Sequence, residues 1–455
     1  MLKFRTAVKP PTITGVAATS TSQLDPVWSL PVGFSIVLTE LEFSLNGTSG
    51  WTPIYSGPAL TFAHTGRAAN TTYYYRARVQ DSQGHYSLYS SVASATTPSG
   101  NYIKWYRGHY VQSNQIASAS VQGYQESWLS EIENDANIVG LMYLFYWGLF
   151  ETSRDVYNFG PIDNIRNLCA AYGKKLTLHM SDRIFNASSN NGRLPTYLTS
   201  EPGGSGGIWI GPEPRVVAKI WLQAIMDREL AAWAALAARY DGDPVIAAAY
   251  SSEITPGNAT GDPTYSTSAM TAQWKRWANH AKANWLHTPV FVLTNSLAGG
   301  AGPREIIEHV YQLNSNVGVG DTDVLPSPHN QTPGMRVWEG IDASQSGAPF
   351  DYRGRIPYIS IVQSPTLGGK ESDEALGVGN TWTMQQIYAA GAGGPAVSGN
   401  RQRGNLMGWV RSTVQPRPPN QTWANDILPA LRAHPSDWPT AATPTSLASY
   451  ELVTS

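Results

Sequence analysis

The chain has 455 residues, more than one hydrophobic core normally supports, so its length predicts two domains. Its formal net charge is −2, which excludes the strongly basic field that attracts nucleic acids or anionic membranes. Aromatic residues make up 11% of the chain, and their flat faces suit either sugar rings or a buried core. We therefore expect a neutral or weakly charged partner and no nucleic acid.

The single cysteine and the lengths of the apolar segments limit the chemistry further. Cys169 excludes an intrachain disulfide and a multi-cysteine metal site, and its helical spacing from Ile162 and Ile165 predicts a buried structural thiol. No apolar stretch reaches the length that spans a bilayer, and no signal-peptide core follows residues 1–5. We therefore expect no membrane insertion and no standard export signal.

Residues 1–98 are rich in Thr, Ser, Val, Tyr and Pro, and contain short strand-like runs, such as 34–38 and 73–79, separated by turns. This pattern predicts an all-β sandwich. The stretch from Thr71 to Pro98 resembles a fibronectin type III module, in which Tyr73 would be the tyrosine-corner residue. The resemblance implies a spacer or attachment domain without chemistry of its own, with ligand binding as the alternative.

Residues 102–434 show apolar runs of strand length that alternate with helical patterns, the clearest of which cover 215–240 and 268–285. This alternation implies parallel strands and predicts an α/β TIM barrel. Residues 435–455 are rich in Pro, Thr and Ser and predict a tail that lies over the surface or is partly disordered. The eight predicted barrel strands are 104–109, 138–146, 175–179, 245–250, 290–294, 317–320, 357–362 and 406–410.

An alanine-rich helical pattern leads through the turn sequence YDGDP into an apolar run that stops at Glu253. Strand ends on one face of a TIM barrel supply the reactive groups. The stretch resembles the fourth strand of retaining (β/α)8 glycoside hydrolases, where a helix ending in RY-x-G-x-P precedes the acid/base glutamate. That family usually has Asn where this chain has Ser252. The resemblance implies that Glu253 is the general acid/base, and the alternative is a structural carboxylate paired with a neighbouring arginine.

Glycoside hydrolysis needs a second carboxyl group beside the scissile bond. In the resembling family the nucleophile ends the seventh strand, where this chain has Gln363, and a neutral amide cannot act as a glycosyl nucleophile. We favour Glu339, which follows the predicted sixth strand, as the second catalytic residue. The other acidic residues in neighbouring loops that could replace it are Asp321, Asp323, Glu371 and Glu374.

Polar and aromatic side chains near predicted strand ends suit the hydroxyls and faces of sugar rings. His179 and Trp409 resemble a histidine and a stacking tryptophan of the same clan. Trp147 and Glu151 precede a Y-x-F turn that also resembles barrel glycosidases, which implies that Glu151 organises its loop. The expected substrate-binding residues are His109, Trp147, His179, Asn295, Asp321, Gln363 and Trp409.

Motifs for other chemistries are missing from the sequence. It contains no phosphate-binding glycine loop between a strand and a helix, no paired-histidine metal motif and no Gly-x-Ser-x-Gly elbow. We therefore expect no cofactor and no metal requirement.

Together these patterns predict an extracellular or virion-associated glycoside hydrolase that cleaves a polysaccharide or oligosaccharide, with Glu253 as general acid/base. The location follows from the fibronectin-like module and from the lack of an export signal. The alternative is a barrel that kept a sugar cleft without catalysis, as a carbohydrate-binding or receptor-binding protein such as a phage virion component, and Gln363 favours it. The sequence leaves the glycan, its linkage and the oligomeric state open.

Overall fold

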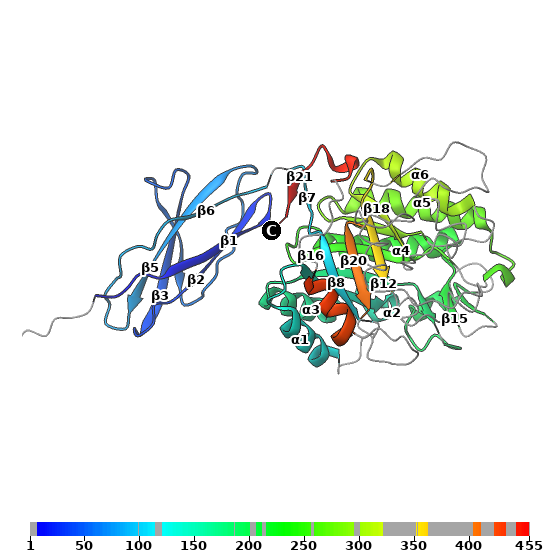
Figure 1. Ribbon diagram of the computed structural model, residues 1–455, viewed down its shortest axis with the longest axis horizontal. Helices are drawn as coiled ribbons and strands as arrows, with labels where there is room; N and C mark the ends of the chain where they lie inside the picture. The colour runs from blue at the N-terminus through cyan, green and yellow to red at the C-terminus, as the bar shows by residue number, and fades with distance from the viewer. Residues whose placement is uncertain are drawn as a thin grey trace, which may run out of the picture. The chain divides into compact units, whose positions relative to one another are not determined.

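The structure is a computed structural model, drawn in Figure 1. Two compact units divide the chain: Met1–Tyr102 with Gly242–Pro244, and Ile103–Asp241 with Val245–Ser455. No helix in the described part of the chain is long and apolar enough to cross a membrane. The described residues are 7–98, 100–113, 121–185, 187–200, 206–211, 215–255, 259–294, 301–321, 352, 354–362, 404–410, 423–433 and 443–454.

The first unit is an antiparallel β-sandwich. One sheet is the pair β1-β2 and the other has the order β4-β3-β5-β6, as the predicted all-β pattern requires. Leu24 and Trp28 from the first sheet pack against Leu41 and Tyr75 from the second. The Tyr73 hydroxyl accepts a hydrogen bond from the Ala68 backbone N–H at 2.9 Å, which is the bond of a tyrosine corner. The strands are β1 (Thr12–Ser20), β2 (Gln23–Ser29), β3 (Ile36–Ser44), β4 (Thr52–Gly57), β5 (Thr72–Asp81) and β6 (Ala93–Thr96).

The second unit is a closed barrel of eight parallel strands, in the order β12-β16-β17-β18-β19-β20-β8-β9 (Figure 1). The predicted fold class, a β-sandwich followed by an α/β TIM barrel, is therefore confirmed. Parallel strands that are covered on both faces have nearly continuous apolar sequences. For this reason the apolar runs in the sequence predicted the positions of most of these strands. The barrel strands are β8 (Gly108–Ser113), β9 (Ile138–Tyr146), β12 (Lys175–Ser181), β16 (Ile246–Glu253), β17 (Val290–Leu293), β18 (Val317–Asp321), β19 (Tyr358–Val362) and β20 (Leu406–Val410).

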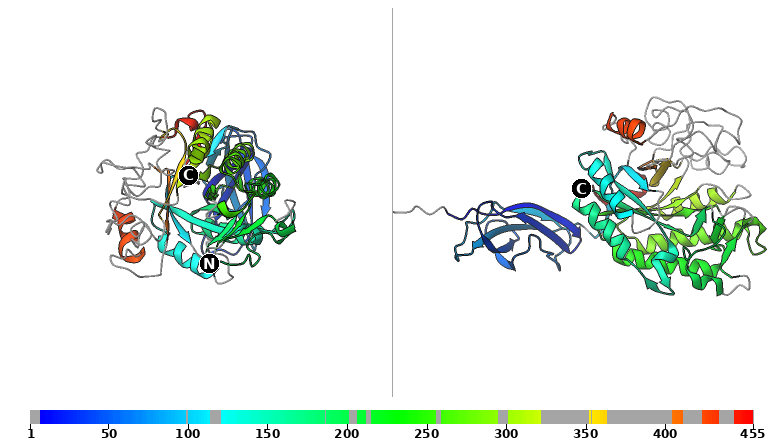
Figure 2. Two further views of the ribbon diagram at one scale, coloured as in Figure 1. Left: turned by 90° about the vertical axis from the view of Figure 1, so that its right-hand side faces the viewer. Right: turned by 90° about the horizontal axis from the view of Figure 1, so that it is seen from below.

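Helices cover the outside of the barrel wall, as the two views in Figure 2 show. Helix α3 packs on β12, α6 packs on β18, and α4, α5 and α6 follow one another as neighbours. Cys169 is fully buried on α3, and burial raises the pKa of its thiol to about 12, as expected for a structural cysteine. The helices are α1 (Val121–Ile132), α2 (Trp147–Phe150), α3 (Gly160–Ala171), α4 (Gln223–Tyr240), α5 (Thr267–Asn284), α6 (Ala301–Leu313), a π-helical turn η4 (Trp423–Ile427) and α10 (Leu428–Ala433).

The barrel wall separates two apolar layers. The layer between strands and helices, here the outer layer, includes Val111, Met407 and Trp409. The layer that fills the barrel interior, here the inner layer, contains Tyr110, Met142, Ala247, Ala248, Tyr250, Phe291, Leu293, Ile359, Ile361 and Leu406, with Tyr106 beneath them. Because side chains alternate along each strand, the layer in which a residue packs shows which way it faces.

Two predicted elements were wrong. The first barrel strand is Gly108–Ser113 and not 104–109, because Gly108 adopts a φ of 139° that interrupts the extended chain before it. The predicted helix over 215–240 begins only at Gln223. Residues Arg215–Ala218 instead form β15, where the β-branched Val216 and Val217 are buried in a small sheet with β13 (Arg183–Phe185) and β14 (Ile208–Ile210).

The described part of the predicted tail is folded rather than loosely laid on the surface. Residues Glu451–Val453 form β21, which pairs with β7 (Tyr102–Lys104), and the Trp105 N–H donates to the Val453 carbonyl at 2.7 Å. Leu447, in the short 3-10 turn η5 (Thr445–Leu447), packs with Ile103 and Trp105. These apolar anchors outweigh the polar composition that predicted a surface tail.

Candidate active site at the carboxyl-terminal mouth of the barrel

Glu253 is the last residue of β16, at the end of the barrel where the strands finish, here the mouth. The pairing of β16 with β17 shifts register between Tyr250 and Glu253: Tyr250 lies opposite Phe291, and Glu253 lies opposite Leu293. This stretch of β16 has one residue more than β17, as in a β-bulge. Phe291 and Leu293 both face the barrel interior, so the shift turns the half-buried Glu253 toward the interior as well. In an unbroken strand, residues 250 and 253 would face opposite sides.

Two serine hydroxyls hold this irregular strand end in place. The Ser251 Oγ accepts a hydrogen bond from the Leu293 N–H at 3.2 Å, and the Ser252 Oγ accepts one from the Asp182 N–H at 3.0 Å. Both serine side chains are buried. Their hydroxyls satisfy backbone donors of the two neighbouring segments where the regular ladder is interrupted. The position of Glu253 is therefore fixed by its own strand and by both neighbours.

Arg183, next to the end of β12, is a buried cation whose charge interacts with that of Glu253. Its side chain is 2% exposed and binds the Asp182 carboxylate through two nitrogens, at 2.8 and 3.2 Å, while a third nitrogen donates to the Thr255 carbonyl. Burial alone would lower the pKa of Arg183, but the negative charges of Asp182 and Glu253 raise it. Glu253 thus has a nearby arginine charge, and it faces the barrel interior.

His179 and Tyr250 line the barrel interior below Glu253. They lie opposite each other in the register of β12 and β16, and their ring centroids are 4.4 Å apart. Within the part of the chain that the structure describes, both His179 nitrogens and the Tyr250 hydroxyl are buried without a hydrogen-bond partner. Burial and the nearby Arg183 charge lower the pKa of His179 to about 3, so the ring is neutral and offers one donor and one acceptor. Such groups suit the hydroxyls of a neutral ligand.

Trp147 and Glu151 form the hub of the loop that follows β9. The Trp147 Nε1 donates to Glu151 Oε2 at 2.7 Å, the Asp155 N–H donates to Glu151 Oε1 at 2.9 Å, and Arg228 from α4 binds the same Oε1 at 2.9 Å. Both Trp147 and Glu151 are fully buried. The prediction that Glu151 organises this loop is therefore confirmed. The placement of Trp147 as a substrate-facing residue was wrong, because its indole is enclosed by this loop and donates within it.

The structure also places His109 and Trp409 away from the mouth. His109 is the second residue of β8, at the amino-terminal end of the barrel, because that strand begins later than predicted. Trp409 packs in the outer layer, and its Nε1 donates to His109 Nδ1 at 3.0 Å. Both side chains are fully buried, and burial lowers the pKa of His109 to about 3. Their predicted positions at the substrate cleft were therefore wrong.

Several predicted site residues lie outside the described residues. These are Glu339, Asn295 and Gln363, and the other second-carboxylate candidates Asp323, Glu371 and Glu374. Asp321 ends β18 at the mouth, as predicted, but only its backbone is described. Within the described ranges no group of three or more His, Cys, Asp or Glu side chains could hold a metal ion.

Sequence reasoning missed Glu229, a fully buried carboxyl group on α4. Burial raises its pKa to about 8, and the charge of Asp182 adds to the effect. The signal was present in the sequence, because Glu229 lies at helical spacing from the buried residues Met226 and Trp233. A carboxylate in an apolar stripe of a helix indicates a buried interaction rather than a solvated face.

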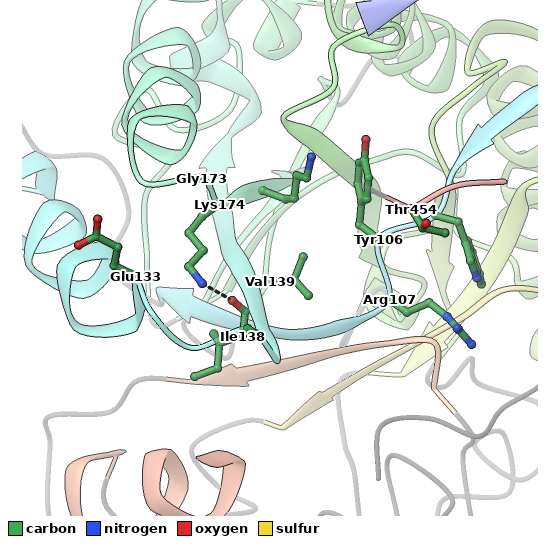
Figure 3. A pocket seen from close by; sticks show the side chains of 11 residues that line it. Tyr106, Arg107, Glu133, Ile138, Val139, Gly173, Lys174 and Thr454 are labelled. Atoms are coloured by element: carbon green, nitrogen blue, oxygen red, sulfur yellow. Dashed lines mark hydrogen bonds between the residues drawn. The ribbon is translucent and has the colours of Figure 1, made fainter. Parts of the chain in front are cut away.

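A hollow of about 530 Å3 lies at the opposite end of the barrel (Figure 3). Its walls include Arg107, Ile138 and Lys175, which lie beside or at the starts of β8, β9 and β12. The Lys174 ammonium is already bound by the Asp135 and Ile138 carbonyls, each at 2.9 Å. This face of a TIM barrel mainly carries stability, so the hollow is not the predicted catalytic cleft.

Comparisons with known proteins are limited to parts of the chain. No protein-family model matches it. An alpha-amylase of Niallia circulans is 35% identical over 72 residues, which is 16% of this chain, so the match spans about one twentieth (5%) of that protein's length. This stretch is far shorter than the barrel unit.

Similar solved structures include fibronectin type III domains. The sixth such domain of human fibronectin type III domain containing protein 3 has 25% identity and a TM-score of 0.19, with coverage of 22% of this chain and 92% of the domain. An Fn3-like protein from Clostridium thermocellum has 23% identity and a TM-score of 0.18, with coverage of 20% of this chain and 96% of that protein. These similarities assign no catalytic role to this chain.

Proposed function

We propose that the barrel is a glycoside hydrolase that cleaves a polysaccharide or oligosaccharide, with Glu253 as general acid/base. The register shift of β16 carries this proposal, because it turns a carboxyl group toward the interior at the end of a parallel barrel where reactive groups gather. The short similarity to an alpha-amylase adds one carbohydrate-active relative.

In the proposed reaction, Glu253 gives a proton to the glycosidic oxygen as the bond from that oxygen to the anomeric carbon breaks. A second carboxylate either attacks the anomeric carbon, forming a glycosyl ester that water then hydrolyses with Glu253 as base, or removes a proton from a water that attacks the anomeric carbon directly. In both cases the hydroxyl of the water ends on the sugar. We assign this role to Glu339, from its place in the sequence after β18. Neutral His179 would bind sugar hydroxyls, and a neutral ligand fits the net charge of −2.

The alternative is a non-catalytic barrel that binds a carbohydrate or a receptor. Two observations favour it: Gln363 replaces the nucleophile of the resembling family, and the charges of Arg183 and Glu253 interact, which also suits a structural carboxylate. An extracellular or virion-associated location belongs to both proposals, because a β-sandwich joined to a carbohydrate-active barrel is typical of proteins that act on polymers at a surface.

The test is glycan release from a panel of neutral polysaccharides by the native chain, by Glu253→Gln and by a control, Glu126→Gln, at an exposed position on α1. General acid catalysis contributes about 10²- to 10⁴-fold, so we expect Glu253→Gln to lose at least about 100-fold while circular dichroism stays unchanged and the control keeps full activity. Undiminished release by Glu253→Gln would refute its role. Retained glycan binding without release by the native chain would support the non-catalytic alternative.

A further inference from the structure

The hollow at the starts of β8, β9 and β12, here the amino-terminal hollow, lies at the end of the barrel opposite the mouth (Figure 3). All the residues that line it belong to the barrel unit, from Trp105 after β7 to Thr454 after β21. Its volume of about 530 Å3 falls within the range of about 300 to 1,000 Å3 that is typical of small-molecule sites. The chemistry of its walls therefore decides which small molecule fits.

Lys174 brings a buried positive charge to the wall of the amino-terminal hollow. The residue is 6% exposed, and its Nζ donates to the carbonyls of Asp135 and Ile138, each at 2.9 Å. An ammonium has three N–H donors, so one donor is left for another acceptor. The Asp135 carboxylate binds Arg432 at 2.9 Å instead, and no carboxylate in the described part of the chain forms an ion pair with Lys174. Its charge is thus balanced by carbonyl dipoles and not by a counter-ion.

Further positive charges line the amino-terminal hollow. Arg107 and Lys175 line it together with Lys174, and among the described lining residues Glu133 has the one carboxylate. The Lys175 Nζ lies 4.0 Å from the centroid of the Tyr106 ring, so an aromatic face holds this cation at the wall. The whole chain carries a formal charge of −2, so the excess of positive charge is local to this end of the barrel. A concave site lined by charges of one sign attracts ligands of the other sign.

An apolar surface lies among these charges. Val139, in β9, lies between Lys174 and Arg107 in the view of Figure 3, and Ile138 before it is also part of the wall. Such a surface suits the carbon frame of a ligand. We propose that the amino-terminal hollow binds a small organic anion, whose carboxylate or phosphate group binds Lys174 and whose carbon frame packs against Val139. This site is separate from the mouth and does not depend on the proposed function.

Titration calorimetry of the full chain tests the ligand class with probes that share one ring: benzoate, phenyl phosphate and the neutral benzyl alcohol. We expect at least one anionic probe to bind and benzyl alcohol not to bind. Tighter binding of benzoate would assign a carboxylate ligand, and tighter binding of phenyl phosphate would assign a phosphate ligand. Binding of neither anion up to about 10 mM, or equal binding of benzyl alcohol, would overturn the proposal. Inorganic phosphate that binds as tightly as phenyl phosphate would overturn the role of the apolar wall.

Four variants locate the bound anion. We expect Lys174→Gln to weaken binding at least about tenfold, because a hydrogen bond to a buried charge is lost. Lys174 also holds two carbonyls, so two exposed positions test the site without disturbing the fold: Arg107→Gln should weaken binding about threefold, and Glu133→Gln should tighten it about threefold. The control Arg154→Gln removes an exposed charge in the loop after β9, at the mouth, and should change nothing. An affinity unchanged by both Arg107→Gln and Glu133→Gln, or weakened by Arg154→Gln, would overturn this location.

Discussion

Glu151→Ala tests the hub that organises the loop after β9. The carboxylate accepts hydrogen bonds from the Trp147 indole, the Asp155 N–H and Arg228, and it is fully buried. Removing one partner of a buried ion pair typically costs about 3 to 5 kcal/mol, because the other charge is left uncompensated. Arg228 keeps a second partner, since it binds the Asp155 carboxylate at 2.6 Å. We therefore expect the lower end, a loss of about 3 kcal/mol in the free energy of unfolding.

Urea unfolding followed by tryptophan fluorescence measures this loss in the barrel, because 14 of the 16 tryptophans follow residue 102. Glu126→Ala, at an exposed position on α1, is the matched control and is expected to change the free energy by no more than about 0.5 kcal/mol. Hydrogen exchange over residues 147–159 separates local opening of the loop from global unfolding. A Glu151→Ala barrel within about 1 kcal/mol of the native chain, with unchanged exchange in the loop, would refute the reasoning.

Two further predictions concern the sandwich and the barrel wall. His64 is buried with its Nδ1 2.9 Å from the Tyr75 hydroxyl, and burial lowers its pKa from 6.5 to about 4. The sandwich should therefore lose about 3 kcal/mol as the pH falls from 6.5 to 4, as hydrogen exchange of β5 in the full chain can show, and His64→Gln should remove this dependence. A Cβ added at Gly140 would lie 1.8 Å from the Lys175 carbonyl oxygen, so Gly140→Ala should destabilise the barrel by about 3 kcal/mol. A Gly140→Ala barrel with an unchanged urea midpoint would contradict the close strand approach at this position.

The sequence was most informative where a strand is covered on both faces. The runs VFVL at Val290 and YISIV at Tyr358 have no alternation of polar and apolar residues, which is typical of a parallel strand between a filled interior and a layer of helices. The first strand reads GHYVQS and is more polar than the IKWY segment before it. Composition therefore placed that strand too early and moved His109 from the start of a strand to its end.

The candidate site was harder to predict, because register and facing are tertiary properties. The pattern predicted that Glu253 ends a strand, but the register shift that turns it inward depends on how β16 pairs with β17. Composition cannot distinguish Trp147 from Trp409. Trp147 is buried in the loop after β9, where it donates to Glu151, whereas Trp409 lies in the outer layer. Arg183, Glu253 and Glu229 come from β13, β16 and α4, and nothing in the sequence shows that the charges of these segments act on one another.

The extra residue between Tyr250 and Glu253 also affects how this strand should be aligned with the strands of relatives. If one serine were deleted there, the glutamate would follow Tyr250 by two residues, and the regular alternation of a strand without the bulge would still turn it toward the interior. When this chain is aligned with relatives, a one-residue gap at Ser251 or Ser252 therefore does not by itself separate proteins whose acid faces the lumen from proteins whose acid does not. A relative with the same spacing shares this facing only if its strand also has the bulge, so the pairing of β16 with β17 decides the facing of the glutamate more than the spacing does.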